Sequence, residues 1–135
     1  MSKTAILYLI VFVIMMAIDF VWLGFVAQKL YRNYIGFLLG ESFKLLPGIL
    51  FYLLYAAGIL VFVVQPLLKD GNLMHALLRG AFFGLVCYAT YDLTNLATIK
   101  NWPLTITLID LAWGTTLTAI VSAASVWAAQ YLKLS

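Results

Sequence analysis

Three aspartates stand inside long apolar stretches of this sequence, where an ionised side chain is costly. Asp19, Asp92 and Asp110 are each surrounded by hydrophobic residues. A carboxylate within a membrane segment costs roughly 3 kcal/mol on insertion scales, and such residues commonly mark proton relays or ion pathways. Because three ionised carboxylates close together would repel one another, we expect a proton or a cation to complete the site.

Polar and aromatic side chains accompany each aspartate. Tyr88 and Asn95 lie about one helical turn before and after Asp92, so the three share a helix face. The candidate ligand- or cation-binding residues are Asp19, Trp22, Tyr88, Tyr91, Asp92, Thr94, Asn95, Thr107, Asp110 and Trp113. The sequence identifies no catalytic residue and no metal ligand within this set, and no cofactor is predicted beyond the proton or cation.

The motif Asp-x-x-Trp occurs twice, at Asp19/Trp22 and at Asp110/Trp113. Residues three positions apart are neighbours on a helix surface. We therefore expect each indole N–H to donate a hydrogen bond to the carboxylate of its own motif. The two indoles would also give the site two flat apolar walls.

Four segments are long and apolar enough to position these residues within a membrane. They cover about residues 4–30, 47–68, 73–99 and 103–132, and a spanning helix needs about 20 such residues. The chain is 65% hydrophobic and 10% charged, whereas about a quarter of a soluble domain is charged. The sequence predicts an all-α polytopic membrane protein, with one transmembrane domain over residues 1–135 and four helices in an antiparallel bundle.

The connections differ in length and character. Residues 69–72 and 100–103 are short turns, which indicate that the helices they join are antiparallel neighbours. Residues 31–46 are longer and mix aromatic, aliphatic and charged residues. Two alternatives remain open for them: an interfacial amphipathic helix lying on the membrane, or an extension of the first helix that turns at Gly40.

The helix directions predict that the three aspartates gather near one membrane face. Asp19 lies past the midpoint of the first predicted helix, Asp92 about two-thirds along the third, and Asp110 about seven residues into the fourth. The third helix runs parallel to the first and the fourth runs back. We therefore expect all three carboxylates in the half of the membrane near residues 31–46 and 100–103, where they would meet as one site.

Charge does not decide the orientation of the bundle. The net charge is only +3, with no basic run of the kind that binds nucleic acid. Loop Lys and Arg residues set membrane topology, and four lie on each side: Lys3, Lys69, Arg79 and Lys133 against Lys29, Arg32, Lys44 and Lys100. Because the N-terminal amine adds one positive charge, we expect both termini on the cytoplasmic side.

Three stretches together resemble a known family. They are Asp19-x-x-Trp22, the run from Tyr91 to Asn95 (Tyr-Asp-Leu-Thr-Asn) and Asp110-x-x-Trp113-Gly114. In these stretches, and over essentially its whole length, the chain resembles a bacterial family of predicted four-helix membrane proteins of unknown function. The resemblance implies a bacterial inner-membrane protein and implies no activity.

Three functions fit the residues. The first is binding or transport of a proton, a cation or an organic amine, with Trp22, Trp113, Tyr88 and Tyr91 offering cation–π contacts. Four helices are few to enclose a pathway, so we expect a homodimer for this function. Besides the lipid bilayer, its partner would be a small cationic or lipid-like ligand.

The second function is a membrane-embedded enzyme that acts on a lipid or isoprenoid. The aspartates could hold Mg²⁺ against a phosphate or act as acid and base. The third is an accessory or assembly subunit without catalysis, in which the aspartates would only pin helices together. Because the acids have no evident buried Lys or Arg partner, the sequence favours the first function, and the other two remain alternatives.

Overall fold

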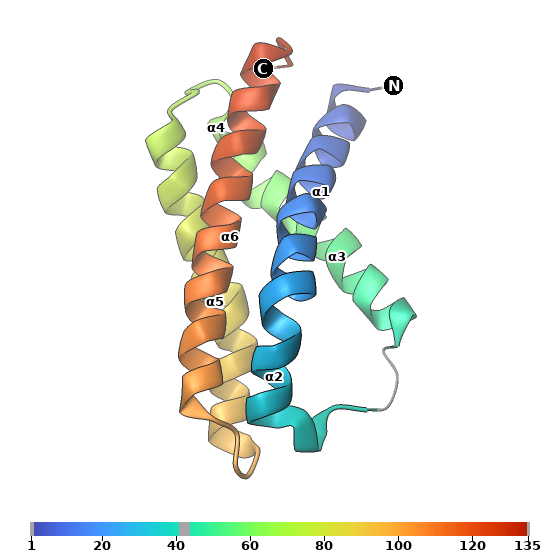
Figure 1. The fold of residues 1–135 in the computed structure, drawn as a ribbon. Coiled ribbons are helices and arrows are strands. Elements are labelled where there is room, and N and C mark those ends of the chain that lie inside the picture. The colour runs from blue at the N-terminus through green and yellow to red at the C-terminus, as the bar shows by residue number, and fades with distance from the viewer. Residues whose placement is uncertain (1, 41–43, 135) are drawn as a thin grey trace.

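The computed structural model describes residues 2–40 and 44–134. Within these residues, four helices are long and apolar enough to cross a membrane: Lys3–Leu38, Leu45–Leu67, Leu73–Thr98 and Leu104–Tyr131. Both chain ends lie at the same end of the bundle, as four crossings require (Figure 1). The predicted fold class, an all-α membrane protein with four transmembrane helices, is confirmed.

The first span is longer than the 4–30 predicted. It consists of α1 (Lys3–Trp22), a π-helical segment η1 (Leu23–Ala27), α2 (Gln28–Ile35) and a 3₁₀ turn η2 (Gly36–Leu38). At 1.5 Å per residue its 36 residues extend ~54 Å, beyond the ~30 Å of a hydrocarbon core. Of the two alternatives for residues 31–46, extension of the first helix describes the part through Leu38, and Glu41–Phe43 lie outside the described residues.

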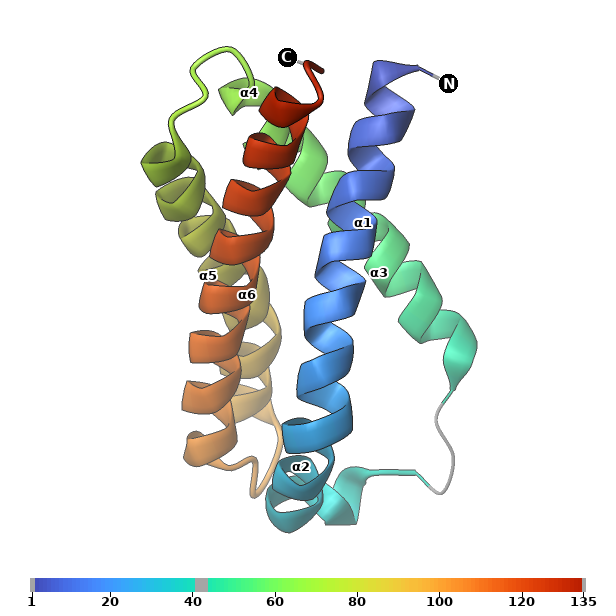
Figure 2. The ribbon, with the colours of Figure 1, turned by 45° about the horizontal axis from the view of Figure 1, so that its top comes forward.

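The second span crosses the first at an angle. It consists of α3 (Leu45–Ile59), a second π-helical segment η3 (Leu60–Val64) and α4 (Gln65–Leu67). Pro47 falls in the first turn of α3, where its missing N–H removes no intrahelical hydrogen bond. Figures 1 and 2 both show the first turns of α3 diverging from α1 and approaching the bundle only further along.

The last two spans, α5 (Leu73–Thr98) and α6 (Leu104–Tyr131), form an antiparallel hairpin (Figure 2). Their backbones approach closely at glycine: a Cβ added at Gly84 would collide with the Gly114 carbonyl oxygen and the Thr118 side chain. Close approach at small residues is how membrane helices gain packing contacts. This contact holds the two helices that carry Asp92 and Asp110 against each other.

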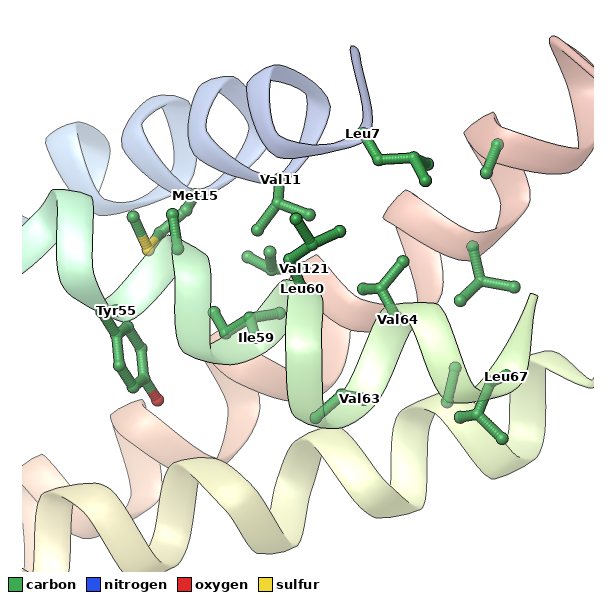
Figure 3. Close-up of a cluster of buried hydrophobic side chains, with 14 of the residues drawn as sticks. Leu7, Val11, Met15, Tyr55, Ile59, Leu60, Val63, Val64, Leu67 and Val121 are labelled. Carbon is green, nitrogen blue, oxygen red and sulfur yellow. The ribbon is translucent and has the colours of Figure 1, made fainter. Parts of the chain in front are cut away.

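The main apolar core lies in the half of the bundle that contains the termini. Leu7, Val11 and Met15 of α1 pack there against the second span and α6 (Figure 3). A smaller cluster of Ile35, Trp102 and Ile106 lies at the other end. The buried aspartates therefore occupy positions between two apolar clusters.

Candidate functional site

Asp92 of α5 and Asp110 of α6 form a buried pair of carboxyl groups. Asp92 is 0% exposed and Asp110 is 6% exposed. The two groups are close enough to share a hydrogen bond when one of them carries a proton. The close contact of α5 with α6 brings them together, so these two predicted site residues meet as expected.

The two carboxyl groups of the pair differ in their hydrogen-bond partners. Asp110 accepts a hydrogen bond from the hydroxyl of Tyr31, which lies on α2. Neither carboxylate oxygen of Asp92 has a hydrogen-bond partner in the part of the chain that the structure describes. Because an unpaired buried charge is strongly unfavourable, a proton between the two groups would satisfy Asp92 and Asp110 together.

Asp19 forms a second centre with partners of its own. Its Oδ2 accepts a hydrogen bond from the Tyr52 hydroxyl of α3, and its Oδ1 accepts one from the Trp113 indole N–H at 3.1 Å. No three His, Cys, Asp or Glu residues within 2–40 and 44–134 are grouped closely enough to hold a metal ion. The structure thus pairs Asp92 with Asp110 and gives Asp19 other partners, and one site formed by all three aspartates stays a prediction.

The length of the first span explains why Asp19 has partners of its own. Because the span continues to Leu38, Asp19 lies near its midpoint and not toward its far end. At that level it faces α3 and Trp113. Tyr31, three turns further along the same span, takes the position beside Asp110.

The two tryptophans are also arranged differently from the prediction. Trp113 donates to Asp19 and not to Asp110 of its own motif. Trp22 stacks on Trp113, with ring centroids 4.4 Å apart and planes 10° apart, and lies next to the Tyr31 hydroxyl. The two rings stack on each other at the interface between α1 and α6. They therefore form one stacked pair and not two separate walls of the site.

Tyr88 lies near the Asp19 centre and packs on α6. Its hydroxyl is within electrostatic range of Asp19, Tyr31 and Tyr52. Its ring covers Gly114, where any Cβ would overlap the ring atoms. Glycine at this position thus lets Tyr88 lie flat against α6.

The remaining predicted residues lie around the pair. Thr107 is buried and accepts a hydrogen bond from the Trp102 indole N–H at 3.1 Å. Tyr91 is 59% exposed and meets Trp102 edge-on. Thr94 is exposed and donates to the Thr90 carbonyl, while Asn95 is half-buried near Tyr91. Tyr91 and Thr94 are thus exposed at the outside of the bundle, and a ligand-binding role for these residues stays a prediction.

Two functional candidates, Tyr31 and Tyr52, were missed from the sequence. Each donates a hydroxyl to a buried aspartate from another span. A tyrosine within an apolar segment normally needs a hydrogen-bond partner, which is the one signal that could have indicated them. Their partners lie 79 and 33 residues away, so spacing alone could not pair them.

The comparisons with known proteins agree with the membrane architecture. No curated protein and no solved structure is significantly similar to this chain. Residues 4–127 match a family described as "Predicted membrane protein (DUF2177)". The match includes all three buried aspartates and both tyrosines that donate to them. The chain belongs to the DUF2177 family of membrane proteins.

Proposed function

We propose that this protein binds and transports a proton, in exchange with a small cation or organic amine, at the Asp92–Asp110 pair. The observation that carries this proposal is Asp92, whose two oxygens are fully buried, lack any donor among the described residues and face a second carboxyl group. Two such groups require positive charge between them.

Nothing among the described residues supplies that positive charge. The one ion pair there joins His75 to Asp70 at 2.8 Å, and both side chains are exposed. A proton, a metal cation or an amine arriving from outside would neutralise the acid pair. Since each of these competes for the same oxygens, binding of one releases another.

The aromatic groups near the pair favour an organic cation as the exchanging ligand. Trp22 and Trp113 are half-buried and stacked, and Tyr31 joins Trp22 to Asp110. Aromatic faces attract ammonium groups by about 0.5–2 kcal/mol. In this arrangement the acid pair binds the charge while the indoles bind its apolar part.

For this function we propose that the protein is a homodimer in a bacterial cytoplasmic membrane, with both termini in the cytoplasm. Four helices are few to enclose a pathway, which supports a dimer.

Proton release on cation binding tests the proposal. Purified protein in weakly buffered detergent would be titrated with Na⁺, K⁺ or tetraphenylphosphonium while a pH dye is followed. We expect saturable proton release that Asp92→Asn and Asp110→Asn abolish. Asp70→Asn, the same change at an exposed acid, should release protons normally. Equal release from wild type and Asp92→Asn would refute the assignment.

Transport is tested separately in proteoliposomes that contain an internal pH dye. An imposed gradient of the cation that released protons should change the internal pH. In liposomes that contain Asp110→Asn, the internal pH should change only as fast as it does in protein-free vesicles. An unchanged rate in that variant would show that the pair lies outside the transport route.

A further inference from the structure

A groove on the outer face of the bundle, between the second span and α5, has the shape and charge of a phospholipid site. We infer that it holds one anionic phospholipid, with an acyl chain in the groove and the phosphate at Arg79. This site is separate from the acid pair and does not depend on the proposed transport.

The groove consists of two adjoining cavities of about 470 and 550 Å³. Phe62 and Phe83 line both cavities, so the two are continuous along α5. Their walls are almost wholly apolar and include Leu78, Val86, Leu54 and Val61. Such a surface suits a hydrocarbon chain.

The length of the groove matches one leaflet of a bilayer. It extends along α5 from Arg79 to Thr90. Eleven residues at 1.5 Å each give ~16 Å, and half of a hydrocarbon core is ~15 Å. An acyl chain bound here would begin below the membrane face that holds the termini and end just past the middle of α5.

Arg79 provides the charge that selects the headgroup. Among the described residues it is the one charged residue that lines the groove, it is exposed, and it lies six residues into α5. A side chain at this depth extends its guanidinium toward the headgroup region. The nearby acid Asp70 is already paired with His75. Arg79 can therefore bind a phosphate through two parallel N–H···O hydrogen bonds.

Stacked aromatic rings hold the groove in a preformed shape. The Phe83 ring stacks on Tyr55 at 5.8 Å and on Phe62 at 6.0 Å. Tyr55 is fixed in turn by a 2.7 Å hydrogen bond to Thr118 of α6. Gly58 lies directly under Phe83, where a Cβ would come within 3.1 Å of the ring. A preformed groove loses little entropy when a chain binds.

Native mass spectrometry tests the site. Protein would be reconstituted in bilayers of equal phosphatidylglycerol and phosphatidylcholine, extracted in mild detergent and weighed with its retained lipid. We expect one phosphatidylglycerol per chain. Arg79→Gln should lower its retention about tenfold, as loss of a charge-assisted phosphate contact predicts. Ala57→Phe, which fills the groove, should abolish retention.

Two matched variants control for general effects. Lys3→Gln removes a cation on the same side of the bundle, and Ala17→Phe enlarges an exposed residue of α1 outside the groove. Both should retain lipid as wild type does. Equal retention by Arg79→Gln and wild type, or no preference for phosphatidylglycerol, would overturn the site. A lipid-free dimer that Ala57→Phe dissociates would also overturn it, by showing that a second copy fills the groove.

Discussion

At the scale of single residues, two buried aspartates in one bundle have opposite surroundings. Asp19 accepts hydrogen bonds from Tyr52 and Trp113, whereas Asp92 faces another carboxyl group and has no donor among the described residues. Donors stabilise a charged carboxylate, and crowding with a second acid destabilises it. Asp19 is thus suited to a fixed role in joining α1 to α3 and α6, while Asp92 is suited to exchange its neutralising partner.

Removal of the Tyr52 hydroxyl should destabilise the bundle measurably. Tyr52→Phe deletes a donor to the buried Asp19 carboxyl, and a buried acceptor left without its donor costs about 1–3 kcal/mol. Tyr8→Phe is the control because its hydroxyl joins the same two helices through the neutral Leu53 carbonyl. Unfolding in mixed micelles should show the larger loss for Tyr52→Phe. Equal losses would contradict a stronger contribution of the Tyr52–Asp19 bond than of the Tyr8–Leu53 bond.

The two members of the acid pair should respond differently to substitution by asparagine. Asp92→Asn supplies an amide donor to Asp110 and keeps the Tyr31 bond to a charged acceptor. Asp110→Asn gives Tyr31 a neutral acceptor, and a neutral bond is about half as strong. Asp92→Asn should therefore be the more stable variant by about 1 kcal/mol in the same micelle assay. The reverse order would contradict the arrangement described.

At the scale of elements, two π-helical segments interrupt the first two spans. η1 separates Asp19 and Trp22 from Tyr31, and η3 separates Tyr52 from α4. A π turn has more residues than an α turn, so it shifts every later side chain around the helix axis. Face assignments based on α-helical spacing therefore do not hold beyond Leu23. This is the physical reason why Tyr31 could not be placed beside Asp110 from the sequence.

The contact between α5 and α6 should be the packing contact most sensitive to added volume. Gly84→Ala places a methyl group against the backbone of Gly114, which can shift only with the whole helix. Overpacking of this kind typically costs 1–3 kcal/mol. Gly24→Ala is the matched control because no atom lies within 4 Å of its added Cβ. Thermal unfolding should separate the two variants, and equal midpoints would disprove the close contact.

At the scale of the whole molecule, hydrophobicity and turn residues predicted the bundle well. The turn at residues 69–72 contains Gly71 at φ +66°, and Asn72 caps α5 through the backbone N–H groups of Met74 and His75. Local chemistry of this kind can be recognised directly in a sequence. The acid site was predicted only in part, because the partners of Asp19 and Asp110 depend on how spans cross and on where the first span ends.

The four-span topology predicts which positions share a membrane side. In a Cys87→Ser background, Ser2→Cys and Leu134→Cys should react with a membrane-impermeant thiol reagent from one side of sealed vesicles. Asn101→Cys, in the turn between α5 and α6, should react only from the other side. Labelling of all three from the same side would contradict the four crossings.

The stacked indoles of Trp22 and Trp113 give the molecule an optical signature. Because the rings are 4.4 Å apart, their electronic transitions couple, and we expect a circular dichroism signal that depends on how the two rings are oriented. One ring is bonded to Asp19, and the other lies next to the tyrosine bonded to Asp110. Occupancy of the acid pair that moves Tyr31 would therefore change this spectrum, so the unlabelled protein carries its own reporter between its two acid centres.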